Sequence, residues 1–314
     1  MAPKATGTMR IAAIEAGGTK FVLGLLEVAS ADVAPRILTK RRIPTGRPEE
    51  TIAEAERWFS SVFGEFGPAD ALGVASFGPL AGRFGESGWG RIGPTPKPGW
   101  AGFDLPGALG AALGLEPAVD TDVNAAALAE GLWGASHGLR DHVYVTVGTG
   151  VGGGVVSNGA LLHGAGHPET GHVPVPREPD DDYFGRCPFH GACLEGMASG
   201  PAVAERWGAP AESLPADHPA WDLEARYLAS GFLPLVHVLA TERIVLGGGL
   251  GSAPGLAERV RSRLSERLAG YTPRLDEPGA MEAFIVRPGL GGDAGLLGAA
   301  ALTIGAAALT IAAG

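Results

Sequence analysis

Short apolar runs and glycine-rich turns follow one another in a pattern that occurs twice in the chain. The first occurrence has apolar residues at 11–14, a glycine turn, and a second apolar run at 21–26. The second has a β-branched and aromatic run at 142–147, a turn at 148–154, and a hairpin signal at Asn158-Gly159. Each half of the chain is therefore predicted to begin with a strand, a tight loop and a returning strand.

Helical and strand patterns alternate in the rest of the chain. Residues 48–66 carry apolar side chains at helical spacing, with glutamates in the early turns that complement the helix dipole. Residues 78–102 are rich in glycine and proline and predict a surface loop, which is either a binding loop or a passive connection. Further helices are predicted at residues 125–133, 227–239 and 256–268, and further strands at residues 71–76, 117–119 and 243–246.

Residues 294–314 contain no charged side chain, and on length alone this run matches a membrane span. We reject that interpretation because the run is mostly alanine and glycine and has no positive flank. It also repeats Ala301-Leu302-Thr303-Ile304 seven residues later, at residues 308–311. This pattern predicts a closing helix that packs against the protein, and no membrane contact.

Composition places the chain among globular proteins of two ordinary domains. It has 314 residues, of which 45% are hydrophobic and 18% charged. The formal charge of −10 argues against nucleic acid as a partner, because that binding depends on basic residues that neutralise phosphates. The first nine residues contain no apolar core of signal-peptide length, so we expect a cytoplasmic protein.

The only cysteines of the chain, Cys187 and Cys193, lie in one seven-residue stretch with His190 between them. Together with His172 they offer two thiolates and two imidazoles, which suit tetrahedral zinc. A disulfide, or two unrelated buried thiols, is the alternative. With four protein ligands the zinc would have no open position for water, so it would fix a loop and leave one ring nitrogen of His172 for another hydrogen bond.

The glycine turns are candidates for binding phosphate. Gly148, Gly150 and Gly153 have the spacing of a dinucleotide fingerprint, but a hairpin rather than a helix is predicted after them, and the chain has no Walker sequence. Bare backbone amides in such turns can approach phosphate oxygens closely, although permissive hairpin turns would look the same. The nucleotide-binding candidates are Gly17, Gly18, Thr19, Lys20, Gly148, Thr149, Gly150, Gly247, Gly248 and Gly249.

Carboxylates occur where a predicted strand meets a helix and around the proposed metal site. Asp122 lies at the strand end and either caps the following helix or accepts the proton of an attacking hydroxyl group. Glu169, His172 and Glu195 bracket the metal-ligand segment and are suited to hydrogen bonds with neighbouring sugar hydroxyls.

These motifs, taken together, resemble the ROK family of repressors, uncharacterised reading frames and sugar kinases, and within it the zinc-containing bacterial fructokinases. The resemblance spans nearly the whole chain. Three positions differ from the wider family in the manner of the fructokinase branch, namely Glu15, Thr121 and His190. The motifs that carry it are Glu15-Ala16-Gly17-Gly18-Thr19-Lys20, Thr95-Pro96-Lys97-Pro98-Gly99-Trp100, Asp120-Thr121-Asp122-Val123-Asn124 and Cys187-Pro188-Phe189-His190.

The resemblance implies an α/β fold of the actin-like ATPase type, with two ribonuclease-H-like domains and a cleft between them. The first domain would hold residues 1–121 and a C-terminal helix at about 296–314, and the second residues 122–295 with the zinc-binding loop 172–193. It also implies ATP and Mg²⁺ as cofactors beside the structural Zn²⁺, Asp122 as base, and a homodimer. Sugar binding would fall to Asn124, Glu169, His172 and Glu195.

The sequence therefore predicts an ATP-dependent fructokinase that phosphorylates the 6-hydroxyl group, with mannose as a further acceptor. A glucokinase or another hexose or N-acyl-hexosamine kinase of the same family is the alternative. A sugar-sensing regulator would need a DNA-reading helix pair before Ile11, where we find only ten residues. A nicotinamide dehydrogenase would need a helix directly after Gly153.

Overall fold

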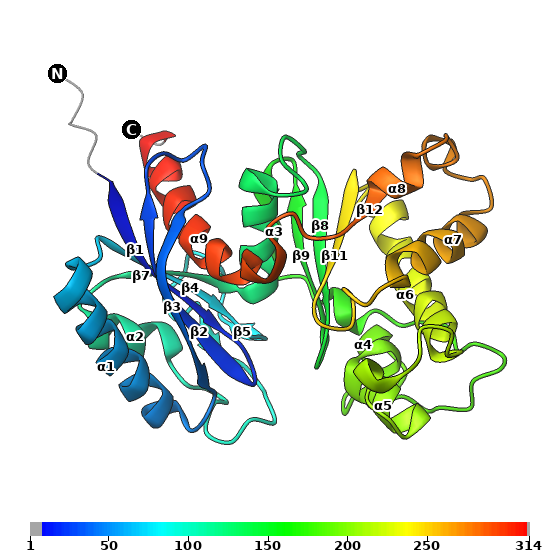
Figure 1. Cartoon of the computed structure of the whole chain (residues 1–314), viewed down its shortest axis with the longest axis horizontal. Helices are drawn as coiled ribbons and strands as arrows, with labels where there is room; N and C mark the ends of the chain where they lie inside the picture. The colour runs from blue at the N-terminus through cyan, green and yellow to red at the C-terminus, as the bar shows by residue number, and fades with distance from the viewer. Residues whose placement is uncertain (1–7, 313–314) are drawn as a thin grey trace. The chain divides into compact units, whose positions relative to one another are not determined.

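The computed structural model describes the backbone of residues 8–312 and the side chains of residues 8–304. The chain forms two compact units (Figure 1). Unit 1 runs to Gly134 and also contains His163–His167 and the chain from Gly292 onward. Unit 2 contains Ala135–Leu162 and Pro168–Gly291, so the chain leaves unit 2 for unit 1 and returns at residues 163–167.

The sheet of unit 1 has five strands in the order β3-β2-β1-β4-β7. β2 pairs antiparallel with β1 and with β3, whereas β1, β4 and β7 run parallel. The predicted strand, turn and returning strand at the start of the chain are therefore confirmed. The strands are β1 (Met9–Ala16), β2 (Lys20–Val28), β3 (Arg36–Pro44), β4 (Ala71–Ser76) and β7 (Pro117–Thr121).

Alternate residues of this sheet face different helices, as the strand period requires. Leu72 and Val74 of β4 belong to the apolar core that includes α1 and α2. Gly73 between them faces α9, because a Cβ atom there would lie 1.8 Å from the carbonyl oxygen of Ala299. Glycine is thus required for the close approach of α9, which Figure 1 shows beside α3. The helices are α1 (Pro48–Phe66), α2 (Leu105–Leu113), α3 (Asp122–Trp133) and α9 (Ala294–Ala312).

The glycine- and proline-rich segment at residues 78–102 contains a two-stranded ribbon of β5 (Leu80–Ala81) and β6 (Arg91–Ile92). The C-terminal end of the segment is buried, since Trp100 is 1% exposed and the centroid of its ring lies 5.6 Å from that of Phe21. The indole Nε1 of Trp100 donates to the carbonyl oxygen of Gly46 (2.9 Å). The expectation of a surface loop is therefore corrected at this end, where a large aromatic side chain joins the core.

Unit 2 repeats the sheet of unit 1, with the strand order β10-β9-β8-β11-β12. β9 again pairs antiparallel with both neighbours, and β8, β11 and β12 are parallel. The α/β fold of two related units is therefore confirmed. The strands are β8 (His142–Val147), β9 (Val151–Ser157), β10 (Ala160–Leu161), β11 (Arg243–Gly247) and β12 (Ile285–Val286).

The helices of unit 2 include one that begins earlier than its apolar pattern predicts. α6 begins at Ala220, seven residues before the predicted start, and ends at His237. The polar residue Arg226 interrupts the apolar pattern there, but it pairs with Asp180 (2.7 Å) and Glu178 (3.0 Å). The helices are α4 (Leu194–Ala198), α5 (Gly200–Trp207), α6 (Ala220–His237), α7 (Leu256–Leu268) and α8 (Ala280–Phe284). Short 3₁₀ turns are η1 (Thr170–His172), η2 (Ala211–Ser213), η3 (Pro273–Leu275) and η4 (Gly291–Asp293).

Helix α3 belongs to unit 1, so the division lies after Gly134 and not after residue 121 as expected. The physical reason is that α3 packs against α9, where a Cβ atom on Gly298 would lie 2.4 Å from the backbone of Ala125. The C-terminal helix forms as predicted, although residues 313–314 and the side chains of residues 305–312 lie outside the described part. Within the described residues, no helix combines the length and apolarity of a membrane span.

Candidate active site

The glycine turn of unit 1 joins β1 to β2. The Gly17 amide donates to the carbonyl oxygen of Lys20 (3.0 Å), and the Thr45 hydroxyl donates to that of Gly17 (2.7 Å). Thr19 and Lys20 are exposed at the tip of the turn. The turn therefore presents backbone and a lysine side chain outward, an arrangement suited to phosphate oxygens.

Lys97 lies beside this turn and was not assigned a function from the sequence. A Cβ atom on Gly18 would lie 3.2 Å from Cε of Lys97. Lys97 and Lys20 are 77 positions apart in the chain, so only the fold brings both lysines to the same glycine turn. The motif Thr95-Pro96-Lys97 was the available signal, but it does not indicate which turn the lysine meets.

Glu15 is the second-last residue of β1, just before the same turn. Burial raises the pKa of its carboxyl group, and the nearby charge of Lys20 acts in the opposite direction. Asp293, next to the start of α9, raises the pKa further by like-charge repulsion. The end of β1 therefore combines a partly desolvated carboxyl group with cationic neighbours.

Asp122 is the first residue of α3, at the end of β7, but it does not cap the helix. The cap is Thr121, whose Oγ1 accepts from the Asn124 amide (3.1 Å). The Oδ1 atom of Asp122 accepts instead from the adjacent Val123 amide (2.9 Å). The capping alternative for Asp122 is therefore wrong. Asn124 is 1% exposed, and its Nδ2 donates to Asp120 (2.8 Å).

The glycine turn of unit 2 joins β8 to β9 and is closed by the Gly148 amide, which donates to the carbonyl oxygen of Gly150 (2.8 Å). β9 begins at Val151, so Gly153 lies within the returning strand and the turn is shorter than the predicted 148–154. Gly150 leaves room for Glu195, because a Cβ atom at this position would lie 2.6 Å from a carboxylate oxygen of Glu195. The same oxygen accepts from the amide of Val151 (3.1 Å).

Two further glycines allow the turn that carries Glu169 and His172 to lie against β9. A Cβ atom on Gly153 would lie 2.2 Å from the Thr170 hydroxyl oxygen, and one on Gly171 would lie 1.7 Å from the Val151 carbonyl oxygen. Glu169 precedes η1, and the His172 amide donates to its carbonyl oxygen (3.0 Å). The predicted sugar-binding residues of unit 2 therefore lie on elements that pack directly on the glycine strand.

The four predicted metal ligands come together in unit 2, with their ligand atoms all within 4.8 Å of one another. The Nδ1 atom of His172 lies 3.5 Å from the sulfur of Cys193 and 3.7 Å from that of Cys187. Nδ1 of His190 lies 3.6 Å from the sulfur of Cys187. Tetrahedral zinc with bonds of about 2.0–2.3 Å separates its ligands by roughly 3.3–3.8 Å, so the residues fit this ion.

The chemistry of the thiols agrees with a cation. Cys187 and Cys193 are buried and not joined in a disulfide, which rules out that alternative. Burial raises the pKa of the Cys193 thiol to about 11, and a bound cation would favour its thiolate form. The Cys193 sulfur also accepts from the Gly196 amide (3.4 Å) and so caps α4, which carries Glu195. The ligand cluster thereby sets the position of Glu195.

A cavity of about 960 Å³ opens beside the glycine turn of unit 2. Gly148 and Thr149 line it together with Gly249, which comes from the cluster after β11. The rest of its wall is mainly apolar and was not predicted, because it comes from separate helices and loops: Gly200, Pro201, Ala204, Pro210, Ala211, Glu212, Leu214, Ala216, Trp221, Leu250, Ser252, Ala253 and Pro254. A glycine turn at the edge of an apolar cavity suits a phosphate chain joined to a flat base.

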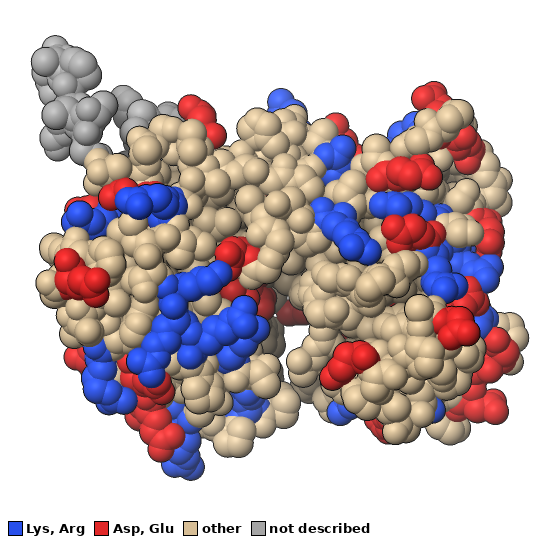
Figure 2. Space-filling model, in the orientation of Figure 1, with Lys and Arg blue, Asp and Glu red and all other residues tan. Residues whose placement is uncertain are grey.

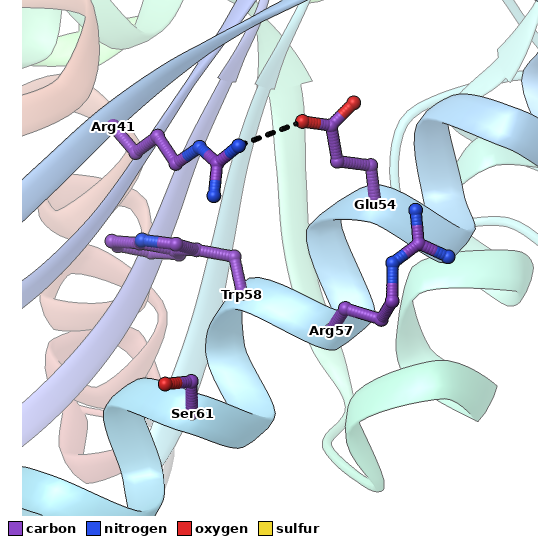
Figure 3. A pocket seen from close by; sticks show the side chains of 5 residues that line it. All are labelled: Arg41, Glu54, Arg57, Trp58 and Ser61. Atoms are coloured by element: carbon purple, nitrogen blue, oxygen red, sulfur yellow. Dashed lines mark hydrogen bonds and ion pairs between the residues drawn. The ribbon is translucent and has the colours of Figure 1, made fainter.

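A smaller cavity of about 250 Å³ lies in unit 1 between β3 and α1. Figure 3 shows Arg41 extended toward Glu54 above the Trp58 ring, with Arg57 and Ser61 farther along the helix. The Arg41 guanidinium group and the Glu54 carboxylate form an ion pair (3.1 Å). None of the predicted site residues lines this cavity.

The sequence model of one family matches residues 11–306. The chain belongs to the ROK family. This ROK protein is 44% identical over 294 residues to a fructokinase from Zymomonas mobilis subsp. mobilis, covering 92% of this chain and 94% of that protein. It is 37% identical over 290 residues to a fructokinase from Pediococcus pentosaceus, covering 92% and 96%.

The fold of this ROK protein is similar to that of solved family members. The crystal structure of a ROK hexokinase from Thermus thermophilus is similar with a TM-score of 0.71 and 30% identity, covering 94% of this chain and 97% of that one. The family resemblance and the actin-like fold expected from the sequence are thereby confirmed.

Proposed function

We propose that this ROK protein is an ATP-dependent fructokinase that transfers the γ-phosphoryl group of MgATP to the 6-hydroxyl group of fructose. The observation that carries the proposal is the 44% identity, over 92% of the chain, to a protein named fructokinase. Two features support it: unit 1 has a carboxylate at a strand end, and unit 2 has Glu195 bonded to the glycine turn that lines a cavity of about 960 Å³.

Asp122 is proposed as the base that accepts the hydroxyl proton of the sugar. Its carboxylate lies at the first residue of α3, whose cap is the neighbouring Thr121. The unit 1 turn at Gly17, Gly18, Thr19 and Lys20 is proposed to hold the phosphate chain through backbone amides and lysine charge. Mg²⁺ would bridge and partly neutralise the phosphate oxygens.

Glu169, His172 and Glu195 are proposed to bind the sugar hydroxyls. Carboxylate oxygens accept hydroxyl protons, and the imidazole Nε2 of His172 is available because Nδ1 faces the sulfur atoms of the metal cluster. Asn124, which is buried in the first turn of α3, is also proposed to bind the sugar. The adenine base would occupy the apolar cavity of unit 2, with the phosphates toward Gly148, Thr149 and the Gly247-Gly248-Gly249 cluster.

Zn²⁺ is proposed to bind His172, Cys187, His190 and Cys193 and to hold the Glu195 helix in place. Four protein ligands leave no open coordination position, so the ion would supply rigidity rather than an activated water molecule. The proposal extends to a homodimer in the cytoplasm, as expected from the family. Sedimentation of the purified protein would test the dimer.

A coupled assay of ADP release with fructose, mannose, glucose and N-acetylmannosamine tests the proposed function. We expect the highest kcat/KM with fructose, because the identity to named fructokinases exceeds 30% over most of the chain. A higher kcat/KM with glucose would favour the glucokinase alternative. Folded protein that binds ATP but releases no ADP with any hexose would contradict a sugar-kinase function.

A further inference from the structure

Asp120 is a buried carboxylate two positions before the proposed base. Its side chain is 0% exposed, and its Oδ1 atom accepts from the Thr121 amide (2.7 Å) and from Nδ2 of Asn124 (2.8 Å). Its Oδ2 atom accepts from Nε2 of His163 (2.7 Å), because an ionised carboxylate can only accept. These donors come from the end of β7, the first turn of α3 and the segment 163–167, so the bonds enclose the turn that carries Asp122.

His163 is held against this turn by aromatic side chains of unit 1. Its side chain is 11% exposed, and its ring stacks on Phe84 with centroids 3.9 Å apart and planes 9° from parallel. The Trp89 ring lies perpendicular to it at 5.8 Å. Trp89 is itself fixed to β7, since its Nε1 donates to the Val119 carbonyl oxygen (3.1 Å). The imidazole is therefore confined on two sides and has its donor directed at Asp120.

We propose that His163 and Asp120 are positioning residues, and that their hydrogen bond holds the β7–α3 turn in the geometry in which Asp122 accepts the proton of the sugar hydroxyl. This inference rests on the proposed function, which gives Asp122 the role of base. Neither residue contacts the reacting atoms, so both act through Asp122.

Steady-state kinetics of substituted holoenzymes test the proposal. His163→Phe keeps the aromatic stack but removes the donor, and we expect kcat to fall about 10- to 100-fold, with the KM for ATP changed less than about threefold, because a small misplacement of a reacting group costs this much. His163→Gln places an amide donor near the position of Nε2 and should recover most of the lost kcat. His237→Phe is the matched control, since His237 is exposed and its ring contacts Tyr271.

The selective loss in kcat and its recovery by glutamine separate positioning from general stability. His163→Phe with wild-type kcat, or His163→Gln as impaired as His163→Phe, would overturn the proposal. If His163→Phe does not fold, the same substitution is measured with Asp120→Asn, which removes the unpaired buried charge. Wild-type kcat in that folded double variant would also overturn it. Wild-type enzyme inactive on every hexose would instead overturn the proposed function, and the positioning role with it.

Discussion

Units 1 and 2 have the same sheet order but place different side chains behind the turn between their first two strands. In unit 1, Gly18 lies beside the flexible side chain of Lys97, and the turn is exposed. In unit 2, Gly150 lies beside Glu195, whose carboxylate accepts a hydrogen bond from the turn itself. The repeated fold therefore supplies one backbone shape, and the element packed against it gives each turn its own chemistry.

This comparison divides the proposed reaction between the units. Unit 1 would contribute the base and lysine-flanked phosphate contacts, whereas unit 2 would contribute sugar ligands and the cavity for the base of the nucleotide. The metal-ligand cluster lies in unit 2, where its Cys193 caps the short helix that carries Glu195. Changes at Asp122 in unit 1 should consequently affect turnover, and changes around Glu195 in unit 2 should affect sugar binding.

The largest effect is expected for Asp122→Asn in unit 1. Asparagine keeps the shape but cannot accept a proton, so kcat should fall by about 10² to 10⁴ while calorimetry still detects fructose binding. Asp104→Asn is the matched control. Asp104 directly precedes α2 of unit 1 and caps it through Oδ1 (3.1 Å), a role that asparagine fills equally well. Turnover of Asp122→Asn within about threefold of wild type would contradict the role of base.

Removal of a metal ligand in unit 2 should have the next largest effect. We expect metal analysis to find about one equivalent of zinc in the wild type and none in Cys193→Ser. The KM for fructose should rise about tenfold or more in this variant, because Glu195 loses its support. His190→Cys preserves a tetrahedral set and should retain the metal. A metal-free Cys193→Ser enzyme with unchanged sugar affinity would show that the cluster does not support the site.

Substitution of one glycine by alanine in each turn tests whether the two turns bind different substrates. Gly150→Ala would place a Cβ atom 2.6 Å from Glu195, so we expect the carboxylate to move and the KM for fructose to rise about tenfold, equivalent to ~1.4 kcal/mol. Gly18→Ala would crowd Lys97 at 3.2 Å and should raise the KM for ATP instead. If Gly150→Ala and Gly18→Ala changed the KM for fructose and the KM for ATP in the same way, the two turns would not have different roles.

The smallest effect concerns the stability of unit 2. Both carboxyl oxygens of Glu224 lack a hydrogen-bond partner among the described residues, and burial raises its pKa well above the ordinary 4.5. A raised folded pKa gives stability that is present below about pH 4.5 and lost as the pH rises through the folded value. Glu224→Gln should therefore raise Tm at pH 8 by about 2–4 °C, the shift expected for ~1 kcal/mol, and leave it unchanged at pH 4.

The control for that stability measurement is Glu258→Gln, since the Glu258 side chain is 60% exposed on α7. Its Tm should follow the wild type at both pH values, because a solvated carboxylate has little to gain from neutralisation. A lower Tm for Glu224→Gln at pH 8 would mean that the buried carboxylate is stabilised in its charged form.

The sequence predicted the parts of the molecule that depend on residues close together in the chain. α1 occupies the predicted residues, because its apolar spacing and an N-terminal proline both indicate the same helix. The metal ligands were recognisable because cysteine and histidine are chemically distinctive. The early start of α6 was missed, since Arg226 pairs with residues 46 and 48 positions away. Lys97 and His163 were missed for the same reason, as their neighbours Gly18 and Asp120 are distant in sequence.

The most direct test of the proposed division of roles is ³¹P NMR of the product formed from ATP and fructose by the wild-type protein and by Asp122→Asn. We expect a single fructose phosphate esterified at the 6-hydroxyl group with the wild type, and almost no sugar phosphate with the variant over the same time. Phosphate on another hydroxyl group, or equal product from Asp122→Asn, would contradict the proposed roles.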